Sequence, residues 1–306
     1  MIALHFSNIK ELKKVHLEAV EDYVLNRMRK TNRNDFYQSV IQLPGFETYP
    51  SDYAETEGNF DWLAQFLLAD FSQLTDWVNL YPHLLKFDYM KRLYLNYFSS
   101  GETTYVDSRN SYNSYTLFRM MDLHVCPYCE HEFIEEVTIK DKTRRTMEMD
   151  HFYPKGADEY PGLAMCFYNL IPSCKPCNQL KLTNPIAASP YDPSIERKTY
   201  LSTNLPLGIN MDTVTPEDCK LNFNAVGEMA LNVETLALDQ RYENVTPEVY
   251  RLLKNNQLYN DDKIHELERL GLGTYEDLKF SLFGNPRKIA KGKELHTKMK
   301  EDLIGY

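Results

Sequence analysis

CPYC at residues 126–129 and CKPC at residues 174–177 are the stretches that decide how the middle of this chain folds. Two residues between the cysteines of each pair let both thiolates face one metal ion, and two pairs complete the tetrahedral site that Zn²⁺ prefers. One CxxC could be a redox pair, whereas two favour zinc. The alternative is four separate thiols in a core. We predict a structural zinc site with the ligands Cys126, Cys129, Cys174 and Cys177.

The 44 residues between Cys129 and Cys174 make the predicted metal a clip at the base of an inserted unit. The chain has six cysteines, and Cys166 and Cys219 lie outside both pairs. We expect these two to be buried and to act as small apolar side chains.

Between the pairs lie residues that can carry acid–base and metal chemistry. The order is MDHFYPK at 149–155, NLIP at 169–172 and CNQLK at 177–181. Histidine exchanges a proton near neutral pH, and carboxylate and amide oxygens suit Mg²⁺. Each residue also has a structural interpretation: His151 as a satisfied core or surface residue, Asp150 as a hydrogen-bonded structural residue, and Asn178 as a helix cap. Their joint order favours a functional site.

These motifs together resemble the HNH endonuclease superfamily, which folds as a ββα-metal unit. The resemblance covers about a fifth of the chain and rests on the paired cysteines, the DH at a strand end, the NL of the next strand and the CNxxK that opens a helix. It implies a catalytic Mg²⁺ or Mn²⁺ held by Asp150 and Asn178, with His151 as general base. It also implies that Asn169 pins the loop that orients the histidine, and that Lys181 lies near the active site.

The family name implies a histidine where this sequence has Asn178, a known variant of the pattern. Oxygen ligands favour Mg²⁺ over tight transition-metal binding. The implied reaction is phosphodiester hydrolysis, in which the histidine accepts a proton from water and a cation neutralises the charge on the phosphate. The alternative function is a zinc-stabilised module without catalysis that binds nucleic acid or a protein. A pure zinc staple would need only the cysteines.

Charge limits where nucleic acid could bind. The net charge is −10, and a protein that grips nucleic acid with its whole surface is usually basic. Segment 138–184 holds seven basic and five acidic residues, so we expect contacts to DNA, with RNA not excluded, from Arg144, Arg145, Lys155 and Lys175. Segment 284–300 holds six basic residues and one acid. It is either a second contact or, as we favour, a solvated helix face.

The fold class expected is α+β, with helical flanking regions around the zinc-stapled domain. The predicted regions are a helical 1–120, the nuclease-like domain at 121–190, and a mixed to helical 191–306 that ends in a basic helix. Hydrophobic periodicity predicts helices at 8–33, 59–98 with a break near Pro82, 115–123, 247–256, 261–270 and 288–303. Strands are predicted at 132–139, 144–152 and 169–173. Aromatic residues, 13% of the chain, are expected mainly to pack the core.

The N-terminal sequence lacks a signal-peptide pattern, and no apolar run could cross a membrane. We therefore expect a cytoplasmic protein. Outside the central motifs, the helical N-terminal region and the C-terminal extension resemble those of the HNH nucleases of bacterial anti-phage systems, Septu-type and retron-associated. The C-terminal pieces that carry this resemblance are LNVETLAL at 231–238, Arg241 with Tyr242, and the late basic helix. That resemblance implies an ATPase partner.

Overall fold

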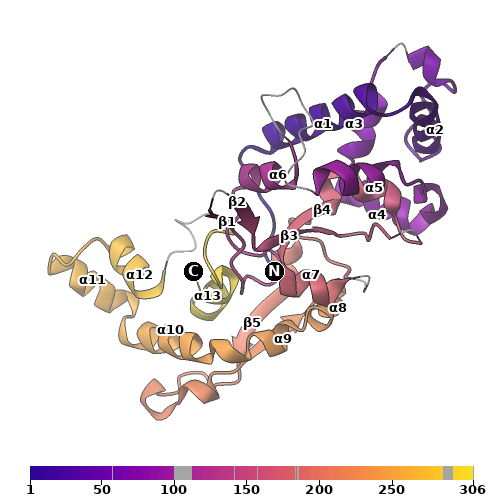
Figure 1. Cartoon of the computed structure of the whole chain (residues 1–306). Helices are drawn as coiled ribbons and strands as arrows, with labels where there is room; N and C mark the ends of the chain where they lie inside the picture. Colours follow the sequence, from indigo (N-terminus) through magenta and orange to yellow (C-terminus); the bar gives the residue numbers. More distant parts are fainter. Residues whose placement is uncertain are drawn as a thin grey trace. The chain divides into compact units, whose positions relative to one another are not determined.

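The computed structural model describes residues 1–56, 58–99, 112–140, 142–156, 158–182, 184, 186–284 and 292–305 (Figure 1). The chain forms two compact units, each built from separate segments. The aromatic unit contains His5–Leu123 and Met147–Ser173; the cysteine unit contains Met1–Leu4, His124–Thr146 and Cys174–Tyr306. The region predicted as one domain, 121–190, contributes to both. Helices predominate beside small two-stranded sheets, which confirms the α+β class.

The aromatic unit is mainly helical. Its helices are α1 (Ile9–Asn26), α2 (Lys30–Val40), α3 (Asp61–Leu67), α4 (Phe71–Leu80), α5 (Tyr89–Leu93) and α6 (Ser114–Met121). A π-helical turn, Tyr94–Phe98, directly extends α5. Short 3₁₀ turns lie at Tyr53–Thr56, Pro82–Leu85, Pro161–Met165 and Phe167–Asn169, and the strands β3 (Met147–His151) and β4 (Leu170–Cys174) pair in one sheet. The predicted break near Pro82 and the helix predicted at 115–123 are confirmed.

The helix predicted at 8–33 is wrong in extent. It divides into α1 and α2 because Arg29 adopts an extended conformation, with φ −61° and ψ 146°. After this break α2 is a separate helix, and it buries Phe36 and Tyr37 completely. Tertiary burial of these two rings outweighs the helical periodicity that runs on through 27–29.

Rings from α2 and α3 form the centre of this unit. Phe36 packs edge-on against Trp62 at a centroid distance of 5.3 Å, and Tyr37 does so at 5.1 Å. Phe66 lies 6.0 Å from Phe36. All four side chains are essentially inaccessible to solvent. Edge-to-face pairs stabilise beyond the area they bury, so the aromatic residues serve packing here, as predicted.

His16 on α1 is a buried histidine with both ring nitrogens bonded. Its Nδ1 lies 2.7 Å from the Tyr112 hydroxyl, and its Nε2 lies 2.7 Å from the Met165 carbonyl oxygen. Burial lowers the pKa of His16 to about 4, although the bond to Met165 opposes this shift. The His16 imidazole is therefore neutral in the folded state, and its protonation favours unfolding.

This burial makes the aromatic unit sensitive to acid. The unfolded chain binds a proton at His16 below its ordinary pKa of about 6.5, while the folded chain does so only near 4. The stabilising contribution is complete above pH 6.5 and declines as pH falls toward 4, by at most about 3 kcal/mol. Urea unfolding at pH 7 and pH 4.5 should show a smaller decline in His16→Gln than in the wild type. Equal declines in both proteins would contradict the prediction.

The cysteine unit holds the remaining elements. Its helices are α7 (Lys175–Lys181), α8 (Glu228–Thr235), α9 (Leu238–Arg241), α10 (Thr246–Leu258), α11 (Asp261–Arg269), α12 (Tyr275–Phe283) and α13 (Thr297–Ile304). Its strands β1 (Glu136–Ile139) and β2 (Lys142–Arg145) form an antiparallel hairpin, and β5 (Thr199–Thr203) pairs antiparallel with β6 (Leu221–Ala225). Figure 1 shows α11 and α12 side by side. The helices predicted at 247–256 and 261–270 are confirmed; α12 was not predicted.

The strand predicted at 144–152 is two strands. β2 pairs with β1 in the cysteine unit, and β3 pairs with β4 in the aromatic unit. Thr146 separates them: its amide donates to the Glu135 carbonyl at 2.9 Å, and its hydroxyl accepts from the Glu135 amide at 3.0 Å. These bonds close the hairpin, and the buried pattern begins at Met147.

The predicted basic C-terminal helix is shorter than expected. α13 begins at Thr297, while Arg287, Lys288 and Lys291 lie outside the described residues. Lys298 is buried and paired with Asp302, and Lys300 is buried and lies 2.6 Å from Glu294. Both expectations for these two lysines, a solvated face or a phosphate contact, are therefore wrong. Carboxylates of the protein itself neutralise the charges of these buried lysines.

Within the described part of the chain, no helix combines the length and apolar character needed to cross a bilayer.

Candidate functional site

The four cysteines of the two CxxC pairs converge in the cysteine unit. Cys126 and Cys129 lie in the turns before β1, Cys174 is the residue that caps α7, and Cys177 lies in its first turn. All four are buried, and their sulfur atoms lie within 4.8 Å of one another. Cys129 Sγ and Cys174 Sγ are 3.9 Å apart. Tetrahedral zinc with bonds of about 2.3 Å needs sulfurs about 3.8 Å apart, so the cluster fits a structural zinc ion.

Hydrogen-bond donors surround these sulfurs. The His131 amide donates to Cys129 Sγ at 3.4 Å, and the Cys177 amide donates to Cys174 Sγ at 3.4 Å. The Arg241 guanidinium donates to Cys177 Sγ at 2.9 Å. Burial by itself lowers the pKa of Arg241, but the thiolates of Cys129 and Cys177 raise it above its ordinary value. Burial by itself raises the pKa of Cys129, but hydrogen bonds with the other three cysteines and the charge of Arg241 lower it below its ordinary value, which favours a thiolate at this sulfur.

His151 lies at the end of β3 in the aromatic unit and is almost fully buried. Its Nε2 lies 3.0 Å from the Ala164 carbonyl oxygen, and its Nδ1 lies 3.2 Å from Lys155 Nζ. A carbonyl oxygen can only accept and an ammonium group can only donate. Both contacts therefore assign the proton of the neutral ring to Nε2 and leave Nδ1 as the acceptor. Asp150, which precedes His151 in the chain, is also buried.

Asn169 ties together the loop that follows His151. Its Oδ1 accepts from the Tyr153 amide at 2.7 Å, and its Nδ2 donates to the carbonyls of Tyr153 at 3.1 Å and Leu163 at 3.0 Å. The backbone adds a bond from the Phe152 amide to the Asn169 carbonyl at 2.9 Å. The fully buried side chain of Asn169 thus joins Tyr153 to Leu163. Lys155 and Ala164, the two residues that contact the His151 ring nitrogens, lie in the same loop.

Asn169→Ala should therefore weaken the aromatic unit markedly. Three side-chain hydrogen bonds are lost and buried backbone groups lose their partners, so we expect a loss of about 2–4 kcal/mol in the free energy of unfolding. Asn26→Ala removes a single exposed bond to Asp22 and should change stability by less than about 0.5 kcal/mol. Urea unfolding of both variants checks this. Similar midpoints for the two would show that Asn169 does not hold the loop.

Tyr94 is a site residue that sequence reasoning missed. It lies on the π-helical turn after α5, its hydroxyl donates to the Met149 carbonyl at 3.2 Å, and its ring meets the His151 ring edge-on at 4.4 Å. Lys155 Nζ lies 4.7 Å from the centre of the same ring. No local pattern marks Tyr94, because it lies 57 positions before His151 in the sequence. The π-helical turn, a feature frequent at functional sites, appears only in the structure.

The other predicted site residues lie in the cysteine unit. On α7, Lys175 is exposed, Asn178 is half-buried and Lys181 is buried. Arg144 is exposed and Arg145 is half-buried on β2. The structure thus brings Asp150, His151, Lys155 and Asn169 into one unit. Their union with Asn178 and Lys181 in a single site stays a prediction.

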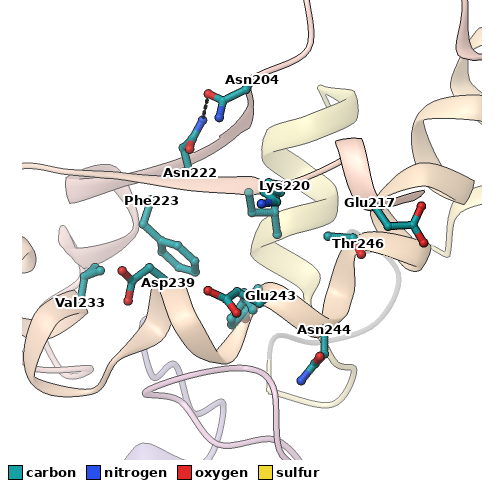
Figure 2. Close-up of a pocket in the computed structure, with 12 residues that line it drawn as sticks. Asn204, Glu217, Lys220, Asn222, Phe223, Val233, Asp239, Glu243, Asn244 and Thr246 are labelled. Carbon is teal, nitrogen blue, oxygen red and sulfur yellow. Dashed lines mark hydrogen bonds between the residues drawn. The ribbon is translucent and has the colours of Figure 1, made fainter. Parts of the chain in front are cut away.

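A pocket of about 700 Å³ opens in the cysteine unit beside β6 and α9 (Figure 2). Figure 2 shows the Asp239 and Glu243 carboxylates near the Phe223 ring, and Glu217 also lines the pocket, against one lysine, Lys220. This excess of carboxylates does not suit a phosphodiester. None of the predicted catalytic residues lines the pocket.

The fold and the cysteine cluster define a class: an α+β protein with a buried four-cysteine site fitted for zinc. Over 77 residues the chain is 38% identical to the Septu protein PtuB of Bacillus thuringiensis. The match covers 25% of this chain and 26% of PtuB, so the similarity is that of a segment. No protein-family model and no solved structure matches the chain.

Proposed function

We propose that this protein is a metal-dependent endonuclease of the HNH type that hydrolyses phosphodiester bonds of DNA in bacterial anti-phage defence. The observation that carries the proposal is His151, whose contacts with Ala164 and Lys155 leave Nδ1 as the proton acceptor. The order of motifs and the partial similarity to a Septu protein support it. The similarity to that protein also supports a role in defence.

His151 Nδ1 accepts the proton of the attacking water in this proposal. The Nε2–H bond to the Ala164 carbonyl holds the ring orientation. Asn169 holds the loop that contains Lys155 and Ala164, the two partners of the His151 ring. Lys155 occupies Nδ1 here, so it exchanges that bond for a phosphate oxygen when substrate binds, which frees the nitrogen for water.

Asp150 and Asn178 would hold Mg²⁺ or Mn²⁺ with one carboxylate and one amide oxygen, a donor set that suits these hard cations. The ion, when bound, neutralises charge on the phosphate and the leaving oxygen. The cysteine unit also carries cations at its surface: Lys175 and Arg144 are exposed, and Arg145 is half-buried. They would contact the DNA backbone, with RNA as the other candidate, and Lys181 belongs to the same helix as Asn178.

A cleavage assay tests the proposal and its regulation. Plasmid with Mg²⁺ should be cut slowly by this protein alone and faster when the proposed ATPase partner is added. The reason is the net charge of −10, which disfavours DNA binding by the isolated chain. Equal rates alone and with the partner, at matched salt, would refute the partner requirement. Absence of cleavage under both conditions, with zinc bound, would favour a non-catalytic zinc module instead.

A further inference from the structure

Arg241 contacts three of the four sulfur atoms of the cysteine cluster. Its Nη1 lies 2.9 Å from Cys177 Sγ, and its Nη2 lies 3.6 Å from Cys129 Sγ and 3.9 Å from Cys174 Sγ. The side chain is only 14% exposed, so these contacts are shielded from water. The same Nη2 also lies 3.6 Å from a carboxylate oxygen of Glu132, which follows the first CxxC pair.

The charge of a four-thiolate centre explains why a cation belongs here. Four thiolates around one divalent ion leave two negative charges in excess, and a buried uncompensated charge is costly. The planar fork of arginine can serve several acceptors at once, which the ammonium of lysine does less well. Donors to coordinated sulfurs also hold the ligands in place.

The backbone is shaped to deliver this side chain. Ala237, between α8 and α9, adopts the left-handed conformation with φ 47°, which is unfavourable for a residue with a Cβ atom. The turn starts the short helix α9, which ends at Arg241. The next residue, Tyr242, is buried and donates its hydroxyl to the Cys129 carbonyl. Consecutive side chains thus engage the first CxxC pair, one through sulfur and one through backbone.

We propose that Arg241 is the charge-compensating residue of this metal centre and that it sets how slowly the bound metal is released. The role is that of a positioning residue, because the guanidinium acts on the ligands and does not touch the metal. It makes the segment 237–242 part of the metal site, although no metal ligand lies within it. It is independent of the proposed nuclease activity.

The test compares Arg241→Met and Arg241→Lys with Arg251→Met, which replaces an exposed arginine on α10 of the same unit. Zinc transfer to excess EDTA is followed at neutral pH, with circular dichroism to verify the fold. Loss of outer hydrogen bonds to ligands costs about 10–100-fold in metal affinity. We expect zinc release to accelerate about 10–100-fold in Arg241→Met, to a lesser degree in Arg241→Lys, and not in Arg251→Met.

Cobalt substitution supplies a readout that packing alone does not move. Hydrogen bonds to thiolate sulfur lower the energy of its lone pairs, so the sulfur-to-cobalt charge-transfer bands should shift to longer wavelength in Arg241→Met. Wild-type release rates and an unshifted cobalt spectrum in a folded Arg241→Met protein would overturn the proposal. So would equal acceleration in Arg251→Met, or wild-type protein that binds neither zinc nor cobalt. If Arg241→Met does not fold, Arg241→Lys decides by the same two measurements.

Discussion

His151→Ala should lower the rate of plasmid cleavage by about 10²–10⁴-fold, the usual cost of removing a positioned general base. The physical reason is that the substitution removes Nδ1, the proposed proton acceptor. Lys155, which lies beside it, is a cation and can only donate. Zinc content, circular dichroism and DNA binding should stay close to wild type. His83→Ala, an exposed histidine of the same unit, should cleave normally.

Asp150→Ala and Asn178→Ala should also be inactive, but through loss of the catalytic cation. High Mg²⁺ or Mn²⁺ should restore part of their activity, because mass action compensates for weaker binding. No metal concentration should restore His151→Ala, because the proton acceptor itself is missing. Titration of both cations against all three variants separates the roles. Wild-type cleavage by His151→Ala would overturn the assignment of the base, and metal rescue of that variant would give it a ligand role instead.

Cys174→Ser should have the largest effect on folding. Purified wild-type protein should contain about one equivalent of zinc, and structural zinc in small sites contributes about 10–16 kcal/mol of apparent binding free energy at neutral pH. Cys174 also accepts the Cys177 amide at the start of α7. Its replacement should therefore leave the cysteine unit misfolded or poorly soluble, with no retained zinc.

Cys219→Ser is the matched control, since Cys219 is equally buried in the same unit but lies outside the cluster. Its sulfhydryl bonds the Thr215 carbonyl, a bond that serine can also make. Cys166→Ser in the aromatic unit should likewise retain zinc. Metal analysis by mass spectrometry and the thermal midpoint should distinguish these proteins. Soluble, folded wild type without zinc would refute the metal assignment, and so would full zinc occupancy in Cys174→Ser.

Features encoded by short sequence spacing could be predicted from the sequence. Two residues between paired cysteines oblige both sulfurs to face the same way, and the four sulfurs do converge. The burial of Cys166 and Cys219 and the helix break near Pro82 are also confirmed. In each case the deciding interaction lies within a few residues or follows from the chemistry of one side chain.

Apart from the convergence of the two cysteine pairs, contacts between distant segments could not be predicted. Helical periodicity runs through residues 27–29, whereas the structure breaks the helix at Arg29 and buries Phe36 and Tyr37 on the second helix. Strand-like sequence continues from β2 into β3, and only the choice of pairing partner separates them. Lysine composition at the C-terminus indicates exposure, yet Lys298 and Lys300 are buried. Asp302 and Glu294, close by in the sequence, pair with them, and Glu248 of α10 adds a distant carboxylate 3.9 Å from Lys300 Nζ.

The sequence by itself therefore determined the four cysteines that cluster, the α+β class and the order of the residues proposed for catalysis. Tertiary structure alone decided which nitrogen of His151 is the acceptor, since that depends on Ala164 and Lys155. It also decided that Tyr94 packs on this histidine and that Arg241 lies against the sulfurs of Cys129 and Cys177. Spacing along the chain sets which side chains share a local face, whereas proton position and charge balance depend on neighbours that only folding brings together.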